Sequence, residues 1–158
     1  MEIRNKSGDL LHETDNHHDL SDLDLGDAVL EGLTLQGAHF EHANLEGANL
    51  QGCDLYWASF FGASLAGADL QGAQLQGVDF TKANLVGANL RGANLGRDNL
   101  GGPSQLQDAT LEGAILDLAN LEGAEYSERT IFPKGFDPEK HKMTLRVRKS
   151  GRFRPLTS

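Results

Sequence analysis

Residues 43–72 read ANLEG ANLQG CDLYW ASFFG ASLAG ADLQG when they are written in blocks of five. Leucine or phenylalanine holds the third position of every block, and this spacing runs without exception from Leu20 to Leu100. Neither the 3.6-residue period of an α-helix nor the two-residue period of a strand keeps every fifth residue on one side. The chain is therefore expected to turn at a corner after each short segment.

The residues around each Leu or Phe, here called the centre of its block, are also regular. After Leu100 the spacing slips by one residue, resumes at Leu106 and ends at Tyr126, which gives 22 centres. Alanine stands two residues before the centre in 15 blocks, and glycine two residues after it in 13. Centres and alanines are predicted to point inward, where burying each leucine contributes roughly 1.5–3 kcal/mol. Glycine is predicted at the corners, where it adopts a positive φ without steric cost.

Blocks such as ANLEG, ADLQG, ANLVG and ANLRG resemble the A-(D/N)-L-x-x motif of the pentapeptide-repeat family. The resemblance covers residues 18–127 and implies an all-β fold, a right-handed quadrilateral parallel β-helix with terminal caps. Four pentapeptides to a coil would give about five and a half coils for the 22 blocks.

The phenylalanine centres support four blocks to a coil independently of the resemblance. Phe40, Phe60 and Phe80 are 20 residues apart, so they are expected to stack in one interior column. The centres expected to continue this column are Leu20, Leu100 and Leu121. At an alanine position, Cys53 is interpreted as a small core residue and not as a reactive thiol.

Residues 96–105, GRDNLGGPSQ, break the pattern. Asp98 and Ser104 fall at alanine positions, and one extra residue arrives with Pro103. An unpaired buried carboxylate would cost roughly 2–7 kcal/mol or more. We therefore predict a protruding bulge or loop here, in which Asp98 turns outward or is paired.

Three parts are expected along the chain. Residues 1–17 are predicted to form an N-terminal cap, a β-hairpin; residues 18–127 form the β-helix; residues 128–158 form a C-terminal cap segment and a basic tail. Caps are needed because an open β-helix exposes its core and its strand edges. Residues 142–158 are either a further strand or a disordered tail, and deleting them is expected to leave the melting temperature nearly unchanged.

Charge is distributed unevenly. Residues 18–126 carry 16 acidic and 3 basic side chains, a net charge of −13, whereas residues 134–158 carry 2 acidic and 8 basic ones. The acidic body is expected to favour a basic partner surface and not to bind nucleic acid directly. The start, MEIRNKSGDL, has no apolar run for a signal peptide or membrane span, and the chain has a single cysteine, which predicts a cytoplasmic protein.

Sites of catalysis or cofactor binding are not expected. The sequence contains no GxSxG, HExxH, CxxC or P-loop pattern. His39 and His42 would lie beside Asp19 and Asp22 of the previous coil, which offers a weak metal site as one interpretation. Solvated His–Asp neighbours on different corners are the preferred one.

A non-enzymatic protein-interaction module, monomeric or weakly dimeric, is therefore the first prediction, with an unidentified protein partner. The resemblance implies an alternative, because family members that mimic B-form DNA bind DNA gyrase and modulate it. An enzyme is the third and most distant alternative.

The sharpest site hypothesis is an aromatic patch of Tyr56, Trp57 and Phe61. These residues follow their centres by one or two positions and are therefore expected at outward corners, and Tyr and Trp are enriched at binding hot spots. The alternative is that the rings lie flat over neighbouring glycines such as Gly37 and Gly77, or pack under a terminal segment.

Overall fold

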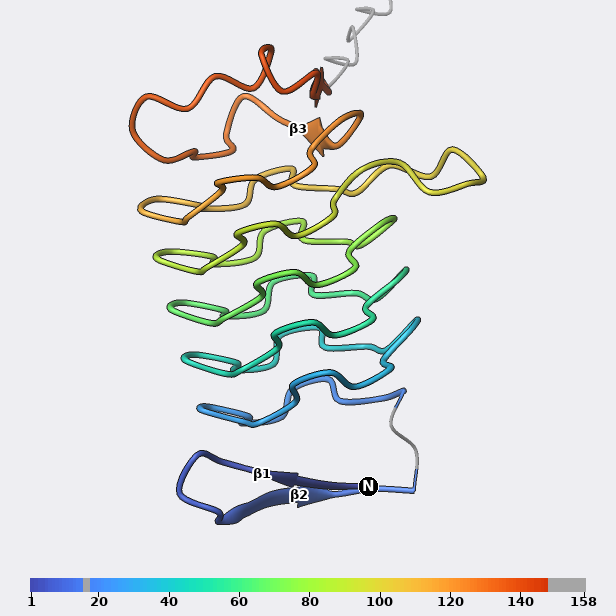
Figure 1. Ribbon diagram of the computed structural model, residues 1–158, viewed down its shortest axis with the longest axis vertical. Helices are drawn as coiled ribbons and strands as arrows, with labels where there is room; N and C mark the ends of the chain where they lie inside the picture. Colours follow the sequence, from blue (N-terminus) through green and yellow to red (C-terminus); the bar gives the residue numbers. More distant parts are fainter. Residues whose placement is uncertain (16–17, 148–158) are drawn as a thin grey trace, which may run out of the picture.

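The computed structural model describes residues 1–15 and 18–147, which form coils stacked along one axis (Figure 1). At one end, β1 (Glu2–Arg4) and β2 (Leu10–Glu13) form an antiparallel hairpin. At the other end, β3 (Glu125–Tyr126) pairs in parallel with β4 (Thr144–Leu145). Among the described residues, no helix is long and apolar enough to cross a bilayer.

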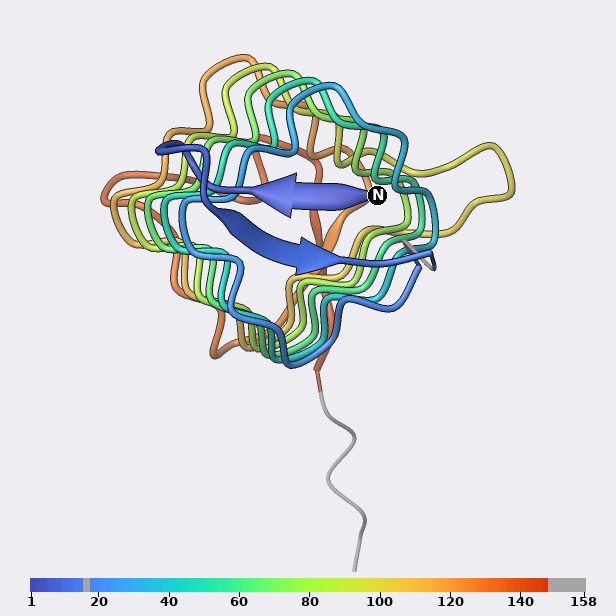
Figure 2. The ribbon, with the colours of Figure 1, turned by 90° about the horizontal axis from the view of Figure 1, so that it is seen from below.

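Single parallel β-bridges, and not long strands, join neighbouring coils. Bridge partners such as Asn49 and Asp69 lie 20 residues apart, so four pentapeptides complete a coil. The centres extend the pairing, since the Leu50 N–H donates to the Asp69 carbonyl of the next coil at 2.7 Å. Because a turn follows each short extended segment, the coils have the four-sided outline seen in Figure 2.

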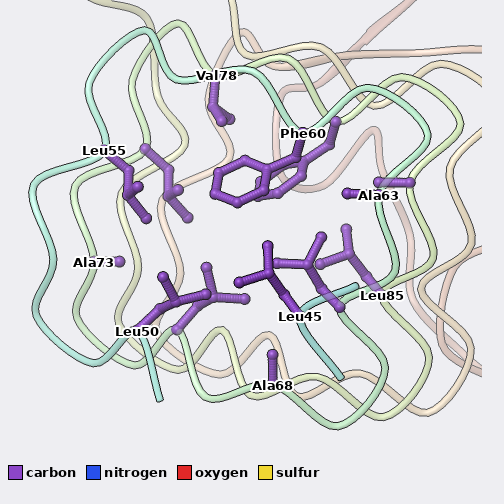
Figure 3. Close-up of a cluster of buried hydrophobic side chains, with 14 of the residues drawn as sticks. Leu45, Leu50, Leu55, Phe60, Ala63, Ala68, Ala73, Val78 and Leu85 are labelled. Atoms are coloured by element: carbon purple, nitrogen blue, oxygen red, sulfur yellow. The ribbon is translucent and has the colours of Figure 1, made fainter. Parts of the chain in front are cut away.

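The centres and alanines fill the interior (Figure 3). The Phe40 and Phe60 rings stack with centroids 4.7 Å apart and planes 2° apart, and Phe60 stacks on Phe80 at 5.2 Å. Cys53 is fully buried, and its thiol donates to the Leu30 carbonyl at 2.9 Å. Burial raises the pKa of this thiol to about 11, so it stays neutral and unreactive near neutral pH.

The prediction that the array is interrupted by one extra residue is wrong. Asp79 pairs with Gln105, 26 residues along the chain instead of 20, so six residues leave the coil. The phenylalanine column consequently passes from Phe80 to Leu106, whose preceding residue supplies the carbonyl that accepts the Phe80 N–H at 2.8 Å. These six residues, one pentapeptide and one further residue, therefore form a loop outside the stacked coils.

Leu100 and Leu121 therefore do not belong to the predicted column. Leu100 is 87% exposed, and Leu121 is buried on another face, following Asn120, whose carbonyl accepts the Leu95 N–H. The physical reason is Asp98, which would have put a carboxylate in an alanine position had Leu100 remained a centre. Ser104, by contrast, does occupy such a position, because its hydroxyl donates to the Leu75 carbonyl at 2.8 Å.

Corner residues have a left-handed backbone whatever their side chain. Gly52 has φ 64°, but Trp57, Lys82 and Leu118 have φ 58°, 60° and 60° at the same position of their blocks. A left-handed conformation costs a residue with a Cβ roughly 1–2 kcal/mol. The coil geometry thus imposes this conformation, and non-glycine corners need compensation elsewhere.

Both ends of the β-helix contact the flanking segments. In the hairpin, the Arg4 carbonyl accepts the Val29 N–H at 2.8 Å, and Ile3 is fully buried. At the far end, Met143 is 8% exposed, and β4 extends the sheet. Residues 142–147 are thus part of the folded structure, whereas residues 148–158 of the predicted tail lie outside the described residues.

Candidate protein-interaction site

Residues 96–103 form the most prominent projection from the wall, the yellow loop in Figures 1 and 2. Leu100, in the turn of this loop, is 87% exposed. Within the loop the Arg97 guanidinium donates to the Gly101 carbonyl at 3.1 Å, and the Asp98 N–H donates to the Gly102 carbonyl at 3.0 Å. These bonds hold the loop in a closed turn that presents an apolar side chain to solvent.

Asp98 fastens the loop to the previous coils. Its Oδ2 accepts the Trp57 Nε1–H at 2.8 Å and the Tyr56 hydroxyl at 3.2 Å. Its Oδ1 accepts the N–H groups of Leu100 and Gly102. All four donors converge on one carboxylate that is only 7% exposed, so a residue that is unfavourable inside the wall becomes the anchor of the loop.

Two effects act in opposite directions on the pKa of Asp98. Removal from water raises this pKa, but the hydrogen bonds from Gly102, Trp57, Tyr56 and Leu100 stabilise the carboxylate and bring the pKa below its ordinary value. Asp98 therefore remains ionised near neutral pH and keeps all its donors.

Close packing of Trp57 depends on two glycines. A Cβ added at Gly77 would lie 3.0 Å from Trp57 Cε2, and one at Gly102 would lie 2.8 Å from Trp57 Cζ2. The indole thus lies over Gly77, as the alternative interpretation of the aromatic patch expected, while Trp57 remains 50% exposed. Hydrogen bonding to Asp98 and this packing compensate for its positive φ.

Phe61 belongs to a different cluster. Its ring meets the His42 ring edge-on with centroids 5.6 Å apart, and Lys82 Nζ lies 5.3 Å from its centroid. Tyr56 and Trp57 are joined instead by their own ring contact, with centroids 6.4 Å apart. The predicted patch therefore divides into a loop anchor and a separate corner group, and the sequence did not indicate Asp98 as the link.

In the described structure, His39 and His42 do not form a metal-binding ligand set with Asp19 and Asp22. His39 Nδ1 lies 3.1 Å from Glu41 Oε1, while its backbone bridges to Asp19. His42 faces Phe61. Within residues 1–15 and 18–147, no group of three or more His, Cys, Asp or Glu side chains could hold a metal ion.

Glu41 is instead an acceptor between coils. The Ser21 hydroxyl donates to its Oε2 at 2.9 Å. Burial raises the pKa of Glu41, but hydrogen bonds with Ser59, His39, its own backbone and Ser21 lower it to about 2 overall.

Replacing Glu41 by glutamine is expected to make the free energy of unfolding depend less on pH under acidic conditions. The folded-state pKa of about 2 lies below the ordinary 4.5, so the carboxylate stabilises the fold above pH 4.5. That contribution is lost as the pH falls from 4.5 to about 2. Urea unfolding between pH 7 and pH 2 should show a larger decline for the wild type than for Glu41→Gln. Glu112→Gln, at an exposed position, is the control, and parallel curves for wild type and Glu41→Gln would contradict the assignment.

Comparison with known families gives a match over most of the repeat region. The family described as "Pentapeptide repeats (8 copies)" matches residues 24–60, 58–97 and 104–125. The break between the last two segments falls at the loop that the structure extrudes. No curated protein matches the chain.

Several solved structures are similar. A pentapeptide repeat protein from the thylakoid lumen of Arabidopsis thaliana is 37% identical, with 66% of each chain covered and a TM-score of 0.47. A pentapeptide repeat protein from Nostoc PCC 7120 is 31% identical over 82% of this chain and 85% of that chain, with a TM-score of 0.42. QnrB1, a plasmid-mediated fluoroquinolone resistance protein, is 22% identical over 81% of this chain and 77% of its own, with a TM-score of 0.39.

Proposed function

The chain belongs to the pentapeptide-repeat family, whose fold is a right-handed β-helix solenoid, and on this basis we propose that it is a non-enzymatic protein-interaction module. Its contact surface is the loop at residues 96–103 together with the half-exposed Trp57 beside it. The partner is a protein with an apolar pocket inside a basic surface.

The observation that carries the proposal is the way the loop is held. Leu100 is 87% exposed although it lies in a turn fixed by Asp98, Tyr56 and Trp57. A pre-ordered loop loses little conformational entropy on binding, so an exposed leucine on it is an efficient anchor. The half-exposed indole next to it adds one of the residue types most enriched at hot spots.

Charge supports a basic partner surface. Residues 18–126 carry a net charge of −13, with 16 acidic and 3 basic side chains. Such a field accelerates encounter with a positively charged surface. The loop then supplies the specific contact.

Partner capture is expected to depend on Leu100. Leu100→Ser should reduce capture by at least about tenfold, the effect of about 1.4 kcal/mol, without changing the melting temperature. Trp57→Ala should also weaken capture by loosening the loop, whereas Phe61→Ala, in the separate corner group, should not. Quantitative affinity capture with the purified full chain as bait measures all three; equal capture by wild type and Leu100→Ser would remove the loop from the interface.

The acidic rod also favours a second candidate, a DNA-mimic modulator of DNA gyrase. A supercoiling assay with purified gyrase tests it directly. Unchanged supercoiling at a molar excess of the protein would exclude this candidate and leave the interaction module with another partner.

Residues 1–17 and 128–147 act as end caps in this proposal, on either side of the repeat body at residues 18–127. The burial of Ile3 and the hydrogen bond between Arg4 and Val29 support this role at the N-terminal end. The burial of Met143 supports it at the other end.

A further inference from the structure

A groove of about 530 Å³ lies between the last coil and the segment that follows it. Figure 1 shows that this segment crosses above the last coil. One wall is residues 114–118 and the other is residues 133–136 with His141. Its apolar lining includes Ile115, which is 44% exposed, Leu118, which is 87% exposed, and the half-buried Phe136.

The coil that forms the first wall has an open backbone edge. One coil below, the Leu90 N–H donates to the Ile115 carbonyl and the Ala88 carbonyl accepts the Ile115 N–H, which closes a parallel bridge. The equivalent groups of the last coil are the Leu116 N–H and the Ala114 carbonyl. Neither has a backbone partner among the described residues. An extended peptide laid along the groove would satisfy both by strand addition.

Neighbouring parts of the same coil are closed. The Ala109 carbonyl accepts the Ile131 N–H at 2.9 Å, and the Ala124 carbonyl accepts the Thr144 N–H at 2.8 Å. The open stretch lies between these two paired stretches, and it also includes the Leu121 N–H and the Ala119 carbonyl, which likewise have no backbone partner among the described residues.

The backbone conformation and exposure of Leu118 are a second observation that favours an apolar contact at this edge. It occupies a corner with φ 60°, where glycine stands in 13 of the 22 blocks of the sequence. It is 87% exposed, so no burial in the described structure offsets the cost of roughly 1–2 kcal/mol for this backbone conformation. A contact made across the groove would offset it.

Charge and chain length identify the occupant. Asp117 is the acidic residue that lines the groove, and Lys134 on the opposite wall is exposed. The surrounding residues 107–122 contain four acidic and no basic side chains, of which Glu122 forms an ion pair with Lys142. Residues 148–158 contain four basic and no acidic side chains, with two large apolar residues, Phe153 and Leu156. They follow Val147 at this same end of the β-helix, and 11 extended residues span up to about 36 Å. Being tethered, they reach the groove at a high effective concentration.

We propose that residues 148–158 bind in this groove as an added parallel strand, with Phe153 against Leu118 and Phe136. Residues 150–154 supply the backbone groups that pair with Ala114 and Leu116. The pairing ends at Pro155, which has no N–H to donate. The tail thus covers the Ala114–Leu116 side of the last coil of its own chain.

Hydrogen exchange at single amides tests the proposal in the intact protein. The Leu116 amide is expected to exchange at least about tenfold more slowly in the wild type than in Phe153→Ser, because only the wild type keeps the added strand closed. Leu118→Gly should give the same loss of protection while relieving backbone strain, so unfolding cannot explain it. Leu100→Gly, which removes an equally exposed leucine elsewhere, should leave the protection unchanged.

Three results would overturn the proposal. Equal Leu116 protection in wild type and Phe153→Ser would show that the tail does not cover the edge. Equal protection in wild type and Leu118→Gly would remove the proposed contact. Protection that disappears on dilution of the wild type would assign the groove to a second copy instead of the chain's own tail.

Discussion

Leu70→Asp is expected to unfold the β-helix. Leu70 is fully buried, and its N–H pairs with the Asn89 carbonyl of the next coil, so the new carboxylate cannot move to solvent without breaking the stack. Losing a buried leucine costs about 2–5 kcal/mol, and burying an unpaired charge costs more. The total approaches the whole stability of a typical domain, about 5–15 kcal/mol.

Gln71→Asp is the matched control one residue away. Gln71 is exposed, and its side chain accepts one long hydrogen bond from Asn89 at 3.4 Å. Its replacement is expected to change stability by less than about 1 kcal/mol. Circular dichroism melts compare the two variants, and an equal loss of signal from both would show that the inward and outward positions had been misassigned.

Ending the chain at His141 is expected to have the second largest effect. It removes Met143, which is 8% exposed, and the Lys142 carbonyl that accepts the Gly123 N–H at 2.9 Å. It also removes Arg146, the ion-pair partner of Glu125, and leaves that carboxylate only 6% exposed without its cation. Loss of the methionine alone costs about 2–5 kcal/mol, or about 4–20 °C in melting temperature.

A chain ending at Val147 separates this effect from that of the tail. It keeps Met143, β4 and the pair between Arg146 and Glu125, so it is expected to lose far less stability. Thermal melts of the two truncated chains test this: equal melting temperatures would mean that residues 142–147 contribute nothing to stability. The earlier expectation that residues 142–158 are dispensable is therefore replaced by a boundary at Val147.

Sequence periodicity determined the coil because its physical requirement is local. Each block must bury one large and one small side chain, so the position of Leu45 or Ala48 within its own five residues already fixes which way it points. The 20-residue interval between Phe40 and Phe60 then indicated the number of blocks in a coil, because identical rings stack best in one column.

Tertiary structure alone decided how the array is interrupted and what the aromatic residues do there. Leu100 and Leu106 both satisfy the local pattern, and choosing between them depends on pairing with Phe80 one coil below. Trp57 looked like a free corner residue because its partner, Asp98, lies 41 residues further along the chain. A five-residue motif contains no information about contacts between coils. These contacts place the loop outside the coil, because the Asp98 carboxylate is stable beside an indole N–H and unstable among alanines and leucines.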